Sequence, residues 1–211
     1  MTRELCGLCR RAVGLVVVSG DHALGRGRKS YELREWSEAY GSLSEADGAA
    51  PLGAADLELL GRAAYMLGRD DDYIVALERA HRAHLVEGRP HLAVRCAFFI
   101  GLNLMPRGEV ARATGWFGRA QRLLERELGD CVERGYLLMP VLLGHVANGE
   151  SEAAYEIACA AADLGDRFGD DDLLALGLME KGHALVRPYG EQVIDDLTLE
   201  EADAFLDAVL S

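Results

Sequence analysis

Four segments of the chain place alanine at the same two positions, seven residues apart, with a further apolar residue between them. The first alanines of successive segments are 37, 37 and 41 residues apart. That distance accommodates two helices of about 12 to 15 residues and two short turns. The four segments are Trp36–Ala46, Tyr73–Ala83, Val110–Ala120 and Ser151–Ala161.

The spacing of the alanines has a physical explanation. Residues at i, i+4 and i+7 share one face of a helix, and small side chains there let two helices approach closely. Chance matches in an alanine-rich chain are the alternative, but all eight positions are alanine. We therefore predict an all-α stack of antiparallel helix pairs. Such a stack presents an extended surface to a partner and has no chemistry built into it.

Composition narrows the classes of protein further. No run reaches the roughly 18 to 20 apolar residues needed to span a membrane, so no membrane association is expected. The five cysteines are odd in number and irregularly spaced, which favours reduced thiols and a cytoplasmic protein. A net charge of −13 disfavours direct nucleic acid binding, because that needs clustered Lys and Arg. Basic or apolar partners are expected instead.

The sequence predicts three parts. Residues 1–21 lie outside the repeats as an N-terminal extension, residues 22–187 form the repeat array, and residues 188–211 form a linker and a capping helix. Within the array, glycines and basic residues at 25–29 precede a helix over 31–46. Asp56 is expected to be the N-cap of the next helix. Pro140 is expected to kink a helix over 131–147. Thr198-x-x-Glu201 is a capping box for a helix over 199–210.

The repeats resemble tetratricopeptide (TPR) repeats, which form right-handed superhelical solenoids. The likeness rests on the small-residue pattern, on the helix glycines Gly101 and Gly182, and on the turns at Gly108-Glu109 and Gly149-Glu150, although the period exceeds the 34 residues usual for TPR. Roughly 150 residues also resemble the repeat region of actinobacterial LuxR-type transcriptional regulators. The segments that carry this second likeness include Leu67–Asp71, Ala76–His81, Trp116–Leu124 and Asp130–Tyr136.

The LuxR-type family joins its repeats to a DNA-binding helix-turn-helix, and the sequence contains none. The resemblance therefore implies a regulatory or scaffolding module linked to transcriptional control, with no direct contact to DNA. No catalytic residue and no cofactor follow from the resemblance. No nucleophile elbow, phosphate-binding glycine loop or paired acid motif is present either, so we do not expect an enzyme.

Several residues could in principle bind a metal. Cys6-x-x-Cys9 has the spacing of half a zinc site or of a redox pair, but a second pair of ligands is missing, so a simple thiol pair is preferred. His81 and His84, with His91 just beyond them, have a spacing that could bind a metal, but the pair is interpreted as exposed side chains. Aspartates 70–72 and 170–172 lack the spacing of a calcium loop and are interpreted as solvated caps. No metal site is therefore expected.

The first helix of each pair lines the concave face in TPR arrays, so the resemblance also implies a binding groove. Its mostly apolar character suits an amphipathic helix of a partner protein or peptide, or alternatively an apolar small molecule. Packing between neighbouring helices is the competing interpretation for each of its residues. The predicted groove residues are Tyr65, Arg95, Phe98, Leu102, Tyr136, Met139, Leu143, Met179 and His183.

Overall fold

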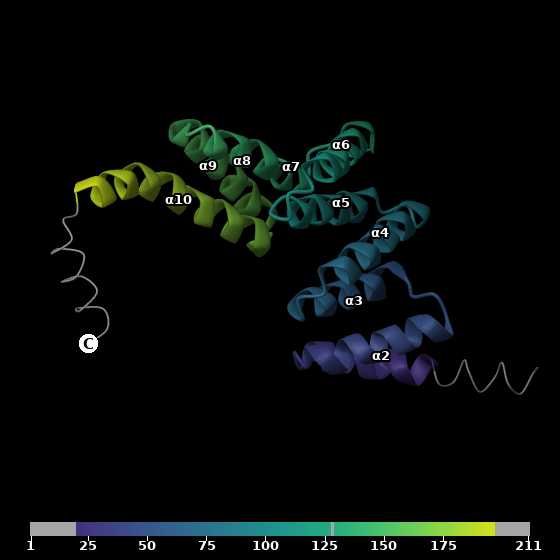
Figure 1. The fold of residues 1–211 in the computed structure, drawn as a ribbon. Helices are drawn as coiled ribbons and strands as arrows, with labels where there is room; N and C mark the ends of the chain where they lie inside the picture. Colours follow the sequence, from purple (N-terminus) through teal and green to yellow (C-terminus); the bar gives the residue numbers. More distant parts are fainter. Residues whose placement is uncertain (1–19, 128, 197–211) are drawn as a thin grey trace, which may run out of the picture. The chain divides into compact units, whose positions relative to one another are not determined.

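The computed structural model describes residues 20–127 and 129–196, with side chains as far as residue 186. Every regular element in these ranges is an α-helix and none is a strand, which confirms the predicted all-α class (Figure 1). The chain divides into two compact units, Met1–Gly129 and Asp130–Ser211, and each is described by itself. The expected helix over 199–210 and the pair Cys6 and Cys9 lie outside the described residues.

The first unit is a series of helices in which each packs against the next along the chain. A helix over residues 20–32 comes first. The helices that follow are α2 (Trp36–Ala49), α3 (Ala54–Met66), α4 (Asp70–Val86), α5 (Pro90–Leu104) and α6 (Val110–Glu127).

The second unit is arranged around its third helix. A short α7 (Glu133–Tyr136) and α8 (Met139–Ala147) both contact α9 (Ser151–Phe168), and α10 (Asp171–Asp196) packs along α9 as well. Glycines allow the close approach of α9 and α10. A Cβ atom built on Gly165 would lie 2.4 Å from the backbone nitrogen of Leu174, so no larger residue fits there without movement.

The repeated alanines occupy buried positions on the helices, as the spacing predicts. Seven of the eight are at most 3% exposed, and only Ala83 is half-buried. Where α3 meets α4, a Cβ on Gly61 would lie 3.4 Å from the Cβ of Ala76, so two small residues meet at this crossing. The alanine pattern therefore marks the positions where helix packing demands a small side chain.

Five glycines end helices in the left-handed region of backbone conformation. Gly68, Gly88, Gly108, Gly149 and Gly169 have φ between 66° and 76°. After each, the next backbone N–H donates to a carbonyl five residues back, for example from Arg69 to Ala64 at 2.9 Å. This is the Schellman arrangement, in which glycine avoids the steric penalty of positive φ. The same turn thus precedes α4, α5, α6, α9 and α10.

The structure corrects the prediction for residues 25–46. Residues 20–32 form a helix where the glycines suggested a separating segment, and the expected helix over 31–46 is interrupted at Arg34, whose φ is 60°. Gly27 explains the first difference. A Cβ there would come within 2.7 Å of the Leu43 side chain, so this glycine permits close helix packing and does not break the helix.

Asp56 is not the N-cap of α3. The cap position is Gly53, and Asp56 lies within the first turn of the helix, where it is nearly buried. Its carboxylate accepts two hydrogen bonds from Arg28, at 2.7 and 2.8 Å. This bidentate pair joins the helix over 20–32 to α3.

Prolines 140 and 188 also act differently from the prediction. Pro140 lies in the first turn of α8, where a missing N–H costs nothing, so the segment is divided into α7 and α8 and is not one kinked helix. Helix α10 continues through residue 188 to Asp196, where the sequence predicts a linker from 188 onward. Among the described helices, none combines the length and the apolar character that crossing a membrane requires.

Candidate functional site

The predicted groove residues of the first unit differ in their accessibility. Tyr65, near the end of α3, is 54% exposed, whereas Arg95 and Leu102 on α5 are half-buried. Phe98 is fully buried and lies next to the ring of Phe117, with 6.2 Å between ring centres. Phe98 is therefore part of the core between α5 and α6, and it does not face an open groove.

The predicted residues of the second unit divide in the same way. Tyr136 and Met139 are buried, and Leu143 is half-buried. Met179 and His183 are both exposed on α10, and their spacing of four residues places them on one side of that helix. Of the predicted set in this unit, the structure brings these two together on the surface.

Helix α10 carries an exposed apolar stripe that extends beyond the predicted residues. Leu178, Met179, Leu185 and Val186 are each 48% to 66% exposed. Leu185 and Val186 follow Leu178 and Met179 by seven residues each, so the four side chains share one side of the helix. The heptad spacing of 178 with 185 and of 179 with 186 was visible in the sequence and could have identified the stripe.

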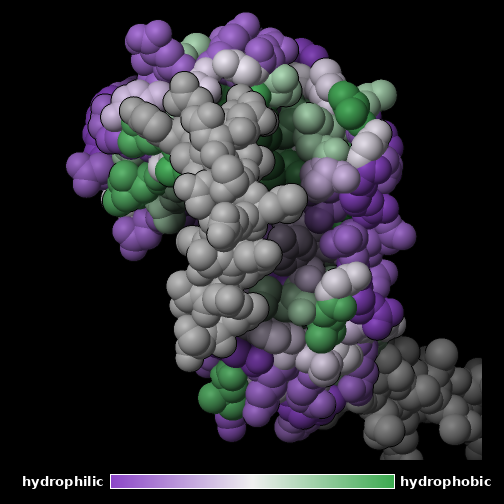
Figure 2. All heavy atoms as spheres, turned by 60° about the vertical axis from the view of Figure 1, so that its left-hand side comes forward, coloured by the Kyte–Doolittle hydropathy of each residue, from purple (hydrophilic) through white to green (hydrophobic). Residues whose placement is uncertain are grey.

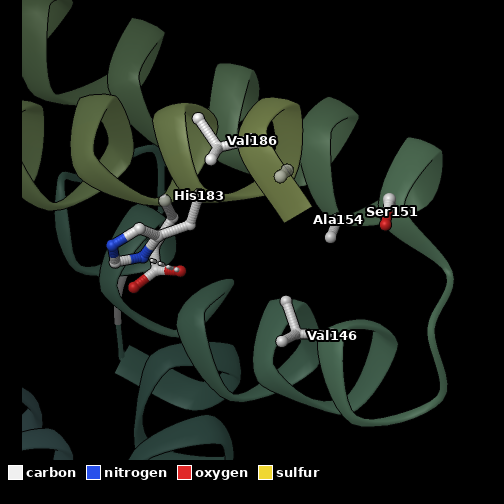
Figure 3. Close-up of a pocket in the computed structure, with 7 residues that line it drawn as sticks. Val146, Ser151, Ala154, His183 and Val186 are labelled. Atoms are coloured by element: carbon white, nitrogen blue, oxygen red, sulfur yellow. Dashed lines mark ion pairs between the residues drawn. The ribbon is translucent and has the colours of Figure 1, made fainter. Parts of the chain in front are cut away.

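A cavity of about 330 Å³ lies beside this stripe, between α8, α9 and α10. Figure 3 shows Val146 of α8 pointing into the space opposite α10. Ala154 and Ala184 contribute further apolar wall, and Val186 belongs to both the cavity and the stripe. The polar lining residues are Ser151, Glu180 and His183, the last two of which form an ion pair at 3.5 Å.

The charge of the chain is distributed unequally between the two units. Residues 130–211 contain 18 Asp and Glu against 4 Lys and Arg, a net charge of −14. Residues 1–129 contain 17 Asp and Glu against 18 Lys and Arg, a net charge of +1, which completes the total of −13. The surface visible in Figure 2 is mostly hydrophilic, with hydrophobic residues in a few separate places. The acidic character of this protein thus belongs to the second unit.

His81 and His84 are buried, so the prediction that they are exposed is wrong. Their side chains are 8% and 0% exposed, because they continue the buried side of α4 that begins with Ile74 and Leu77. Nδ1 of His81 donates to the carbonyl oxygen of Ala93 at 2.8 Å, since that oxygen can only accept. Extending the apolar period of α4 through both histidines would have predicted their burial. His91, just beyond them in the sequence, is exposed.

Glu58, His84 and Cys96 form a polar cluster inside the first unit, on α3, α4 and α5. Their potential ligand atoms all lie within 4.8 Å of one another, and zinc accepts all three residue types. However, Nε2 of His84 already lies 2.5 Å from Oε1 of Glu58, and the other oxygen of Glu58 lies 3.6 Å from Arg62.

The Cys96 thiol is held in its protonated form. Burial, with a smaller contribution from Glu58, raises the pKa of this thiol to about 12. A metal would have to displace the thiol proton and also separate His84 from Glu58. Nδ1 of His84 has no hydrogen-bond partner among the described residues, and its distance to Oε2 of Glu87 is 3.9 Å. We therefore interpret the cluster as a polar contact between His84 of α4 and Glu58 of α3, with Cys96 of α5 beside it.

The two aspartate triplets have different roles. Oδ1 of Asp170 accepts a hydrogen bond from the backbone N–H of Leu173 at 3.0 Å and caps α10. Residues 70–72 instead lie within the first turn of α4. There Asp71 pairs with Arg107 and Asp72 accepts hydrogen bonds from Tyr40 and Arg69.

Comparisons with known proteins add no identification. No model of a protein family matches the chain, and no curated protein matches it significantly.

Proposed function

We propose that this chain is a non-catalytic interaction module, a right-handed TPR-like solenoid that acts as a regulatory or scaffolding protein in transcriptional control in the cytoplasm. The packing of each helix against the next in the first unit, and of α8 and α10 against α9 in the second, supports a repeat architecture, as do the small residues at helix crossings. The link to transcription rests on the sequence resemblance alone. The surface features of the second unit allow a more specific proposal.

The observation that carries the proposal is the exposed apolar stripe of α10 with its adjoining cavity. Four large apolar side chains on one side of a helix favour contact with the apolar face of another helix. The cavity beside them, lined by Val146, Ala154 and Ala184, accommodates one anchoring side chain of that helix.

The charge of the second unit specifies the polar side of the partner. A net charge of −14 over residues 130–211 attracts Lys and Arg and repels acidic segments. Glu180, in the cavity lining, places a carboxylate at the apolar surface itself. We therefore infer that the partner segment is a basic amphipathic helix.

Fluorescence anisotropy with a fluorescein-labelled amphipathic peptide of leucine and lysine tests whether the second unit binds a basic amphipathic helix. We expect saturable binding that weakens with salt, and at least about tenfold weaker binding of a leucine and glutamate peptide with the same apolar pattern. Leu185→Glu or Val186→Glu should abolish binding, because each introduces a charge into the stripe.

A matched control is Val86→Glu on α4, which changes an exposed valine of the first unit in the same way. This variant should bind the basic peptide as the wild type does. The proposal is wrong if the two peptides bind equally, or if Leu185→Glu and Val86→Glu have the same effect.

An apolar small molecule is a second candidate, favoured by the volume of the cavity. About 330 Å³ lies at the lower end of the roughly 300 to 1,000 Å³ typical of ligand pockets. Native mass spectrometry of the purified protein would then show a retained ligand mass. Ala184→Phe, which narrows the cavity, should remove that mass and leave the peptide's contact with Leu178 and Leu185 in place.

A further inference from the structure

A second and larger cavity, of about 700 Å³, lies in the first unit between α4 and α6. Both helices pack against α5, and their outward sides form the cavity walls. Its lining combines basic and aromatic side chains, unlike the apolar cavity of the second unit. The residues that matter here are Glu78, His81, Arg82, Arg112, Trp116 and Arg119.

Positive charge exceeds negative charge in this cavity. Arg112 donates to Glu109 at 2.5 Å and lies 3.9 Å from Glu78, the carboxylate of the lining. Arg82 and Arg119 form no ion pair with any residue in the described part of the chain. Three guanidinium groups thus line a cavity with one carboxylate, in a unit whose net charge is only +1.

The position of Arg119 suits an anion. Its guanidinium carbon lies over the Trp116 ring, 4.5 Å from the ring centre. Stacking uses the face of a guanidinium and leaves its in-plane N–H groups available to an acceptor. Two parallel N–H groups match the oxygens of a carboxylate or a phosphate.

His81 fixes the aromatic wall from the interior. Its ring meets that of Trp116 edge-on, with 5.3 Å between the centres, and its Nδ1 is bound to the Ala93 carbonyl. Trp116 itself is only 8% exposed. The stacked pair of Trp116 and Arg119 therefore rests on a buried, hydrogen-bonded side chain.

We propose that this cavity binds a small anionic ligand bearing phosphate or carboxylate groups, which Arg82, Arg112 and Arg119 contact by charge-assisted hydrogen bonds. The volume exceeds that of a single phosphate ion and lies in the range of small-molecule sites. The proposal is independent of the helix-binding surface of the second unit, because the two sites share no residue.

The fluorescence of Trp116 can report binding of a ligand in this cavity. The chain has two tryptophans, so Trp36→Phe leaves Trp116 as the fluorescent reporter. Titrations use pyrophosphate as the phosphate probe and citrate as the carboxylate probe, at low salt. We expect a saturable change of Trp116 emission with at least one of them, and the stronger probe identifies the preferred group.

Arg82→Gln and Arg119→Gln should each weaken binding at least about tenfold, since each removes charge-assisted hydrogen bonds. Arg119→Lys keeps the charge but loses the planar fork, so its affinity should be intermediate. Arg122→Gln is the matched control, because Arg122 is a neighbouring arginine that lies exposed on α6 outside the cavity lining. It should change the affinity less than about twofold, as expected for an exposed charge that makes no direct contact with the ligand.

Three results would overturn the proposal. The first is the absence of a saturable change with either probe at millimolar concentration, with circular dichroism showing a folded protein. The second is an equal loss of affinity in Arg119→Gln and Arg122→Gln, which would indicate general screening of charge. Tighter binding of a glutamate-rich peptide than of both small probes would also contradict it, because the occupant would then be an acidic protein segment.

Discussion

The hydroxyl group of Tyr136 donates a hydrogen bond of 2.7 Å to Oδ1 of Asp170, and so connects the end of α7 to the start of α10. The same oxygen caps α10 by accepting from the backbone N–H of Leu173 at 3.0 Å. Tyr136 is fully buried. One carboxylate thus positions both a core side chain and the first turn of the helix that carries the exposed apolar stripe.

Substituting Tyr136 or Asp170 should show how much the side-chain hydrogen bond and the helix cap each contribute to stability. Tyr136→Phe removes one hydrogen bond and should lower the free energy of unfolding by about 0.5 to 1.5 kcal/mol. Asp170→Ala also removes the helix cap and should cost more, about 1 to 3 kcal/mol. Urea denaturation followed by circular dichroism measures both values. Asp171→Ala, an exposed neighbour, is the control, and a cost equal to that of Asp170→Ala would contradict the assignment.

The Cys96 thiol should resist alkylation. Burial raises its pKa to about 12, so its thiolate is rarer than that of an ordinary thiol by a factor on the order of a hundred to a thousand at pH 8. Burial and a hydrogen bond with Glu133 also raise the pKa of Cys131, to a smaller extent and at a half-buried position. We expect iodoacetamide to modify Cys159 first, Cys131 more slowly and Cys96 last.

Peptide mapping by mass spectrometry in a Cys6→Ser, Cys9→Ser background checks this order. All three thiols should react at similar rates in concentrated urea, where burial no longer distinguishes them. Rapid modification of Cys96 in the folded protein would show that the cluster with Glu58 and His84 is open to solvent.

The helical architecture could be predicted because it depends on a repeated local pattern. Seven of the eight alanines of the pattern are buried against other helices, so periodicity alone identifies their positions. Gly27 shows where such reasoning ends. Whether a glycine breaks a helix or permits close packing depends on Leu43, which belongs to the next helix, and no local rule includes that neighbour.

The candidate surfaces were harder to predict for a related reason. Helices inside a stack bury more than one side, so apolar residues such as Phe98 and Tyr136 have the same sequence character whether they face a groove or a neighbouring helix. Of the predicted groove residues, Tyr65 on α3 and Met179 and His183 on α10 are exposed, and only at these three did the prediction agree with an exposed surface. The basic cavity combines side chains of α4 and α6, and their proximity follows from packing against α5.

Larger side chains at the repeated alanines should destabilise the fold. Ala113 and Ala161 are fully buried on α6 and α9, so replacing either by leucine forces neighbouring helices apart. We expect a loss of about 1 to 3 kcal/mol for each substitution. Ala111→Leu is a control on α6, because Ala111 is exposed. Equal thermal stability of Ala113→Leu and Ala111→Leu would mean that the alanine pattern does not mark the crossings.

The ion pair between Asp47 and Arg79 should make stability depend on acid pH. Nη1 and Nη2 of Arg79 donate to the two carboxylate oxygens of Asp47 at 2.6 and 2.7 Å, which joins α2's last turn to α4. These hydrogen bonds lower the pKa of Asp47 below its ordinary value of 3.8, with a further contribution from the backbone N–H of Leu52. Burial opposes the shift but does not cancel it.

Because the pKa of Asp47 is lower in the folded than in the unfolded state, the pair stabilises the fold above the unfolded pKa. This stabilisation is lost as the pH falls through the folded pKa. The difference in unfolding free energy between the wild type and Asp47→Asn should therefore be constant from about pH 7 to about pH 5 and should shrink below about pH 4. Urea denaturation at each pH measures it, with Glu32→Gln as an exposed control. A difference that grows toward acid pH would have the wrong sign and would reject this role of the pair.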